Sequence, residues 1–190
     1  MTAGTLHHEV LIAGFGGQGV VLAGHLLASA ALAEGREVVW APSYGPEMRG
    51  GAVHCTVIIS SERIGSPEVS RADSLLIMDR ASLGRFAHRV KPGGLLVLNS
   101  TLISDRPTED ECRVLPIPAS EAAEELGELK VANVVMLGAF LSQCPVVSPV
   151  SLEAAIRNEG LRVLGDNAEP LIAVNLVALA RGAALAGAAR

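Results

Sequence analysis

The residues EVLIAGFGGQGV at positions 9–20 decide the fold of this chain. Glu9 to Gly14 is a short apolar run ending in glycine, a pattern typical of a strand covered on both faces in a parallel sheet. Gly14, Gly16 and Gly19 then match G-x-G-x-x-G where a strand gives way to a helix. Glycine permits a tight turn and lets an anion approach the amides of a helix start, so this loop predicts an anion-binding corner. The alternative is that these glycines only allow the helix to pack closely on the strand.

Strands and helices alternate along the rest of the chain. Apolar runs predict further strands at 37–41, 53–60, 73–79 and 95–99, and an edge strand at 112–117, where Pro116 cannot donate to a central ladder. Helical spacing is found at 17–34, 81–90, 120–127, 133–143, 151–158 and 167–186. The sequence Lys91 to Gly94 (KPGG) indicates a turn that interrupts the chain before the strand at 95–99. The pattern predicts one α/β domain over 1–190: three-layer and Rossmann-like, with a mostly parallel sheet and helices on both faces.

A second glycine-rich loop, SYGPEMRGG at 43–51, follows the predicted strand at 37–41. Because ligands of such sheets lie beyond the carboxyl ends of the strands, both loops are expected at one rim. Prolines fix φ and glycines permit unusual φ, so the path of this loop is expected to be specified. The alternative is a solvated Glu–Arg pair on an ordinary turn. The candidate binding residues of the two loops are Gly14, Gly16, Gly17, Gln18, Gly19, Ser43, Tyr44, Gly45, Pro46, Glu47, Arg49, Gly50 and Gly51.

Composition excludes several classes of protein. The net charge of −5 and the absence of a basic stripe argue against nucleic acid as a ligand. The apolar run from Leu171 to Ala180 falls short of the roughly 20 residues that span a bilayer, and the first ten residues do not resemble a signal peptide. The expectation is a cytoplasmic protein without membrane contact. Charged residues make up only 18% of the chain, which suggests surface covered by partner chains.

Neither a metal site nor a catalytic set is predicted within this chain. The cysteines at 55, 112 and 144 are too widely separated for an iron–sulfur cluster or a zinc pair, and are expected to be reduced. His25 and His54 are more typical of structural histidines than of catalytic bases. A dinucleotide site would need an acid at the end of the second strand, but Glu34 and Glu37 come too early, so NAD binding is disfavoured.

Five segments together resemble the gamma subunit, or gamma domain, of the 2-oxoacid:ferredoxin (acceptor) oxidoreductases. They are IAGFGGQGV at 12–20, SYGPEMRGG at 43–51, the strand near 73–79, KPGGLLVLNS at 91–100 and ANVVMLGA at 132–139. The resemblance covers nearly the whole chain. The opening segment looks most similar to 2-oxoglutarate members.

The resemblance implies a multi-subunit enzyme that oxidatively decarboxylates a 2-oxoacid, transfers the acyl group to coenzyme A and reduces ferredoxin. Alpha, beta and in some members delta subunits would carry thiamine diphosphate, magnesium and iron–sulfur clusters. This chain would contribute as a gamma subunit that is inactive alone, with coenzyme A as the candidate ligand of its rim. The alternative is a free-standing nucleotide- or dinucleotide-binding oxidoreductase domain. A nucleotide-binding regulatory module is a third hypothesis.

Overall fold

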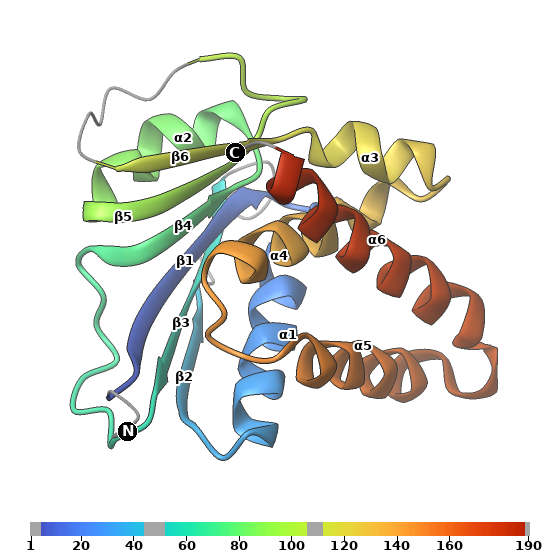
Figure 1. Ribbon diagram of the computed structural model, residues 1–190, viewed down its shortest axis with the longest axis horizontal. Helices are drawn as coiled ribbons and strands as arrows, with labels where there is room; N and C mark the ends of the chain where they lie inside the picture. The colour runs from blue at the N-terminus through green and yellow to red at the C-terminus, as the bar shows by residue number, and fades with distance from the viewer. Residues whose placement is uncertain (1–4, 44–51, 106–111, 189–190) are drawn as a thin grey trace.

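The computed structural model describes residues 5–43, 52–105 and 112–188. Within them the chain forms a six-stranded sheet in the order β2-β3-β1-β4-β5-β6 (Figure 1). The strands are β1 (His7–Phe15), β2 (Glu37–Pro42), β3 (Ala52–Ser60), β4 (Ala72–Ile77), β5 (Val90–Asn99) and β6 (Arg113–Ile117). β6 lies at an edge of the sheet, as Pro116 predicts.

The sheet is mixed, with one reversed strand among the six described. β1, β4, β5 and β6 pair in parallel, whereas β3 runs antiparallel to both of its neighbours, β1 and β2. β2 therefore points the same way as β1. The connection between β2 and β3 is too short for the crossover that a parallel pair would need, which explains the reversal. The expectation of a mostly parallel sheet is confirmed, with β3 as its exception.

Helices cover both faces of the sheet, as predicted. α2 (Arg80–Phe86) and the 3₁₀ turn η2 (Ala87–Arg89) lie on one face, while α1 (Val20–Ala33) and α4 (Ala132–Gln143) lie on the other (Figure 1). α5 (Pro149–Leu164) packs outside α1, and α6 (Glu169–Ala188) packs outside α4. α3 (Ala119–Glu125), η3 (Leu129–Val131) and η4 (Gly165–Asn167) complete the described elements. One side of the sheet thus carries a double tier of helices.

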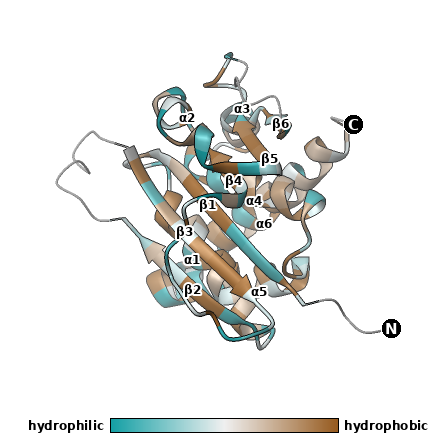
Figure 2. Cartoon of the chain, turned by 90° about the vertical axis from the view of Figure 1, so that its left-hand side faces the viewer, coloured by the Kyte–Doolittle hydropathy of each residue, from teal (hydrophilic) through white to brown (hydrophobic). Residues whose placement is uncertain are grey.

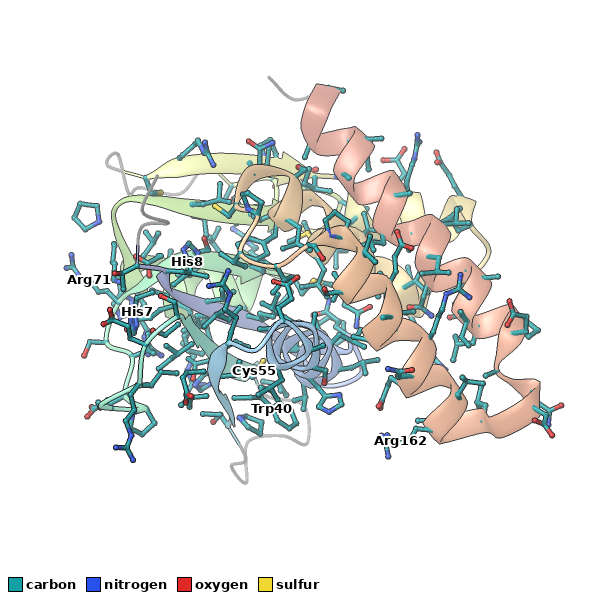
Figure 3. The ribbon with its side chains drawn as sticks, turned by 60° about the horizontal axis from the view of Figure 1, so that its bottom comes forward. His7, His8, Trp40, Cys55, Arg71 and Arg162 are labelled. Carbon is teal, nitrogen blue, oxygen red and sulfur yellow. The ribbon has the colours of Figure 1, made fainter. Side chains whose placement is uncertain are left out.

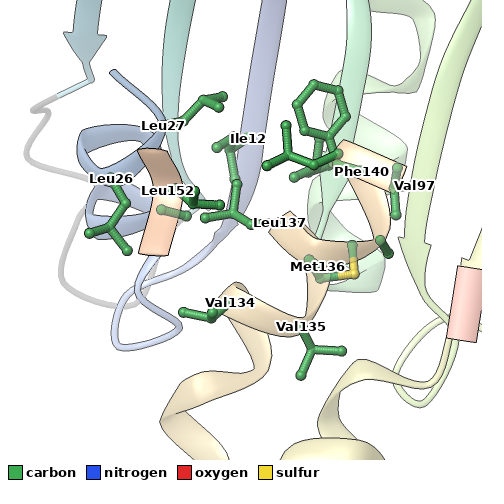
Figure 4. Close-up of a cluster of buried hydrophobic side chains, with 14 of the residues drawn as sticks. Ile12, Leu26, Leu27, Val97, Val134, Val135, Met136, Leu137, Phe140 and Leu152 are labelled. Carbon is green, nitrogen blue, oxygen red and sulfur yellow. The ribbon is translucent and has the colours of Figure 1, made fainter. Parts of the chain in front are cut away.

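The alternation of side chains along each strand divides the core into two clusters. In β3, Val53, Cys55, Val57 and Ile59 all belong to the cluster under α1 and α4, as their spacing of two requires in a strand. Neighbouring positions of the central strands, such as Leu75 and Leu96, face α2 instead. The larger cluster centres on buried residues of α4, including Phe140 and Leu137 (Figure 4). Hydropathy colouring shows the same apolar strands (Figure 2).

The turn predicted at Lys91 to Gly94 is wrong, because these residues belong to β5. The ladder register shifts between Ala72 and Ser74, so that β5 accommodates its extra residues as a bulge, with Gly93 at φ 74°. Lys91 holds this irregular segment in place, since its Nζ lies 2.9 Å from Glu9 Oε2 and 2.8 Å from Asp73 Oδ1. A local turn signal is therefore overridden by the sheet and its ion pairs.

α6 is a packed helix, as predicted, although it is longer than the apolar run suggested. It has 20 residues and a mean hydropathy of 1.8, which would suffice by length and composition to cross a membrane. It lies closely on α4, where Gly138 and Gly182 allow the two backbones to approach. Only 28% of its most apolar window is buried in this chain.

Candidate functional site

The carboxyl edge of the sheet gathers the segments that the sequence singled out. β1, β4, β5 and β6 all end there, because they are parallel. Phe15 at the end of β1 pairs with Ala52, and Pro42 pairs with Cys55. Ser43, whose N–H donates to His54 O over 2.9 Å, therefore lies at the same edge as the first glycine loop. The other candidates, Tyr44, Gly45, Pro46, Glu47, Arg49, Gly50 and Gly51, lie outside the described residues, and their role stays a prediction.

The first loop is shaped by glycines at positions that few other residues could occupy. Gly17 and Gly19 have φ of 101° and 71°, which is the left-handed region. Gly14 is buried, and a Cβ there would lie 2.4 Å from Gln18 Oε1 and 2.9 Å from Met78 Cβ. Gly16 and Gly17 are exposed at the tip. The loop is therefore a tightly specified corner that presents backbone to the surface.

Gln18 braces the loop from inside. Its Oε1 accepts a hydrogen bond from the Phe15 N–H over 2.9 Å, and its Nε2 donates to Met78 O over 3.4 Å. These bonds tie the end of β1 to the end of β4. The amide of Gln18 thus holds the loop through these two bonds, and the role of Gln18 as a binding residue stays a prediction.

Asn133 of α4 and Asn99 of β5 hold the rim in place, and the sequence analysis did not identify either as a site residue. Asn133 Nδ2 donates to Gly19 O over 2.9 Å, while its Oδ1 accepts from the Val134 N–H over 2.8 Å. Asn99 Nδ2 donates to Met78 O at 3.2 Å and to Ser120 Oγ at 2.8 Å. Both asparagines are almost fully buried. Their signal in the sequence was a polar residue placed within an otherwise apolar segment.

Two helices present uncapped N-termini at this edge. α1 begins after Gly19 and α4 begins after Val131, and neither has a side-chain cap or an acidic residue in its first turn. The first amides of a helix carry partial positive charge and bind anions when no side chain occupies them. α2, by contrast, is capped by Asp79, whose Oδ1 accepts from the Ala81 and Ser82 amides at 2.9 and 3.1 Å. The rim therefore offers anion-binding backbone at the start of α1. The first amides of α4 are engaged within the protein, because the Ala132 N–H donates to Leu129 O of η3 and the Val134 N–H donates to Asn133 Oδ1.

A cavity of about 600 Å³ opens beside the glycine loop. Its size falls within the range of small-molecule sites. Phe15, Leu102 and Leu129 stand at its border with 48%, 45% and 60% of their surfaces exposed. Lys130 and two glutamates, Glu124 and Glu128, supply its charges. The cavity is thus chiefly apolar, with the glycine loop on one side and the start of α4 on the other.

The described residues show no arrangement typical of a catalytic centre. The His25 ring lies 5.1 Å from the Trp40 ring, and the His54 ring lies 4.8 Å from that of Phe86. Burial lowers the pKa of His54, with nearby arginines adding to the effect. Within the parts of the chain that the structure describes, no three His, Cys, Asp or Glu side chains gather as a metal site would require. Both histidines thus pack against aromatic rings, and their structural role stays a prediction.

Cys55 is a buried structural thiol next to this site. It lies beside Trp40 and α1 (Figure 3), and its Sγ is 3.4 Å from Val20 O at the start of α1. Burial raises the pKa of its thiol to about 12, so it stays protonated. Cys112 and Cys144 are partly exposed, and all three cysteines are thiols outside any disulfide, in agreement with the prediction that they are reduced.

The family model for pyruvate ferredoxin/flavodoxin oxidoreductase matches residues 9–185. Ketoisovalerate oxidoreductase subunit VorA of Methanothermobacter marburgensis is 40% identical over 175 residues, which cover 92% of this chain and 36% of the relative. 2-Oxoglutarate synthase subunit KorC of the same organism is 41% identical over 160 residues, covering 80% of this chain and 86% of KorC. The chain therefore spans about a third of the VorA relative and most of KorC.

Two solved structures share the fold. The gamma subunit of a keto/oxoacid ferredoxin oxidoreductase from Geobacter sulfurreducens PCA is 33% identical, with a TM-score of 0.80 over 96% of this chain and 99% of the other. The 2-oxoglutarate:ferredoxin oxidoreductase from Magnetococcus marinus, solved with 2-oxoglutarate, coenzyme A and succinyl-CoA bound, is 26% identical. Its TM-score is 0.84 over 96% of this chain and 31% of that chain. The resemblance to gamma subunits is confirmed.

Proposed function

This chain belongs to the pyruvate ferredoxin/flavodoxin oxidoreductase family, and on that premise we propose that it is the gamma component of a multi-subunit, coenzyme-A-acylating 2-oxoacid:ferredoxin oxidoreductase. The observation that carries this proposal is the cavity beside the glycine loop, which leads into the uncapped start of α1. We assign the cavity and rim to coenzyme A. Thiamine diphosphate, magnesium and iron–sulfur clusters belong to partner alpha, beta and, where present, delta subunits. Ferredoxin is reached through those partners.

The shape of the site suits the two chemical halves of coenzyme A. The exposed side chains of Phe15, Leu102 and Leu129 offer apolar contact to the pantetheine arm or the adenine ring. The amides at the start of α1 and the ammonium group of Lys130 would face phosphate oxygens. Glu124 and Glu128 disfavour phosphate on their own side of the cavity. The anionic end of the ligand therefore lies toward the glycine loop, where Arg49 is a further candidate contact.

The substrate we favour is 2-oxoglutarate, in keeping with the glycine-loop segment. A branched-chain 2-oxoacid is the second candidate, because the VorA relative is as similar to this chain as KorC is. We further propose that residues 1–190 act as a single gamma-type unit in the cytoplasm. A free-standing dinucleotide oxidoreductase is less well supported, since β2 ends in Pro42 and Ser43 rather than in the acid that binds ribose.

The test is steady-state kinetics of the complex assembled by co-expression with its alpha and beta subunits. Phe15→Ala and Leu129→Ala should raise the KM for coenzyme A about tenfold or more, because each removes apolar contact from the cavity. Val150→Ala is the matched control, since Val150 is 74% exposed at the start of α5 and away from the cavity. Arg49→Ala should lower coenzyme-A-dependent turnover while the fold survives.

Oxoacid oxidation with an artificial acceptor in the absence of coenzyme A shows whether a variant complex has assembled. A variant that retains this reaction but has a raised KM for coenzyme A is impaired in coenzyme A binding and not in assembly. An unchanged KM for coenzyme A in both cavity variants would contradict the assignment. So would tight NAD or flavin binding by the purified chain, which would support the dinucleotide alternative.

A further inference from the structure

An apolar groove lies between α1, α5 and α6, away from the cavity of the candidate site. Its volume is about 140 Å³, and six of its nine lining residues are leucine, isoleucine or valine. Leu22 from α1, Val163 from α5 and Leu171 from α6 border it with 39%, 59% and 36% of their surfaces exposed. Single exposed apolar residues are common on soluble proteins, whereas several that border one groove mark an interaction surface.

The outward surface of α6, about 120° around the helix from Leu171, is also poor in charge. Val177 is 52% exposed, and the whole helix carries only Glu169 and Arg181 as charged residues. Arg181 is itself engaged, with its Nη2 3.1 Å from Glu125 Oε2 of α3. The exposed positions of α5, by contrast, include Glu153 and Arg157, as expected of a solvated helix. α5 and α6 form the outer tier on this side of the molecule (Figure 1), so none of the elements within residues 5–43, 52–105 and 112–188 covers the outward surface of α6.

The lengths of the relatives indicate what covers it. Most of KorC corresponds to this chain, whereas only 36% of VorA and 31% of the Magnetococcus marinus chain do. The same unit therefore occurs both as a small subunit and within a polypeptide about three times as long. In the long form the additional polypeptide is held permanently beside this unit. Permanent interfaces are more apolar than the remaining surface of a protein, as this groove is.

We propose that the α1–α5–α6 groove and the outward surface of α6 dock a polypeptide homologous to the part of VorA that lies outside the match to this chain. This inference rests on the proposed function, because it assigns one surface to one of the expected partner subunits. The partner inserts aliphatic side chains between Val163 and Leu171 and covers Val177. Glu159 is the charged residue that lines the groove, and its Oε1 and Oε2 are already paired with Arg162 at 2.6 and 2.8 Å.

The position of the groove connects the partner to the candidate site. Leu22 lies in the first turn of α1, immediately after the glycine loop that ends at Gly19. A partner seated on Leu22 therefore stands next to the rim where the anionic ligand is proposed. An anionic membrane surface fits less well, because the described residues that line the groove include no lysine or arginine.

The test is the affinity of this chain for that partner polypeptide, purified separately and measured by biolayer interferometry. Val163→Glu and Val177→Glu should each weaken binding about 30-fold or more, as expected for a charge placed in a desolvated interface. Val150→Glu is the matched control and should change the dissociation constant less than about twofold, because Val150 lies outside the groove. Circular dichroism melting should show that all three variants fold, since each changed residue is more than half exposed.

Wild-type affinity in both Val163→Glu and Val177→Glu would overturn the proposal. A purified chain that dimerises through this face would assign it to a second copy, and flotation with phosphatidylcholine–phosphatidylserine vesicles would assign it to a membrane; either result also overturns it. The proposed function fails separately. If the groove variants lose the partner while Phe15→Ala leaves the KM for coenzyme A unchanged, the docking surface stands and the coenzyme A site does not.

Discussion

Gly182→Ala offers the sharpest test of the packing that supports the site. A Cβ built at Gly182 would lie 1.9 Å from Val135 O and 3.0 Å from Ala139 N, both in the backbone of α4. Reciprocally, a Cβ at Gly138 would lie 2.0 Å from Leu179 O in α6. Ordinary contact begins near 3.4 Å, so α6 and α4 must separate by about 1.5 Å at this point. A backbone carbonyl cannot rotate away as a flexible side chain could.

The magnitude follows from two opposing effects. Alanine in place of glycine inside a helix stabilises by about 0.5–1 kcal/mol. Overpacking costs about 1–3 kcal/mol, and the backbone contact places this site at the upper end or beyond. We expect a net loss of about 2 kcal/mol, which lowers the Tm by roughly 4–8 °C for a chain of this size. Urea and thermal unfolding followed by circular dichroism measure both quantities.

Gly84→Ala is the matched control. Gly84 lies inside α2, and a Cβ there would meet no atom within 4 Å, so the substitution should stabilise by about 0.5–1 kcal/mol. The double variant Gly138→Ala/Gly182→Ala should cost less than the two single variants added together, because one separation of the helices relieves both contacts. The reasoning is refuted if Gly182→Ala is as stable as the parent protein while Gly84→Ala behaves as expected.

Three further predictions follow from individual contacts. Asn133→Ala should destabilise by about 1–3 kcal/mol, because it leaves the Val134 amide without its side-chain acceptor and leaves the Gly19 carbonyl with the Ala23 N–H alone. Asn158→Ala on the exposed side of α5 should change the free energy of unfolding by less than about 0.5 kcal/mol, and equal losses in urea unfolding would contradict this prediction. Burial lowers the pKa of His8 below its ordinary value of 6.5, so the unfolded chain binds more protons and stability should fall as the pH drops through about 6.5. His8→Gln should reduce the pH dependence of the unfolding free energy between about pH 5 and 7. An unchanged pH dependence in this variant would count against the prediction. Cys55, with its pKa raised to about 12, should resist Ellman's reagent in the folded protein and react only in denaturant, while Cys144 reacts in the folded state. Rapid labelling of Cys55 in the native protein, identified by mass spectrometry, would contradict this prediction.

The fold could be predicted largely because its signals are local. The spacing of two in β3 and the glycine loop before α1 each depend on neighbouring residues, and both appear in the structure. α5 was predicted to end at 158, but it continues to Leu164. Gly160 lies inside it, at a position where a Cβ would come within 2.6 Å of Ile172 Cγ1. That glycine serves the contact with α6 and does not end the helix. A residue-by-residue propensity cannot distinguish these two uses.

The interior of the site could not be predicted in the same way. Asn133 contacts Gly19 across 114 residues of sequence, and Gln18 reaches Met78 across 60. The pattern of residues shows that these amides are polar and flanked by apolar neighbours, but only the topology brings β1, β4 and α4 to one edge. Sequence reasoning therefore found the glycines that shape the rim and missed the asparagines that lock it.

α4 links the proposed docking face to the candidate site. α6 lies on α4 through Gly138 and Gly182, and Asn133 in the first turn of α4 holds the carbonyl of Gly19. α6 is thus connected to the glycine loop through α4, a helix in which most residues are buried. A substitution that separates α6 from α4 should therefore disturb the loop as well as lower stability. Gly182→Ala should then weaken coenzyme A binding in the assembled complex more than Asn158→Ala does, although residue 182 lies outside the residues that line the cavity.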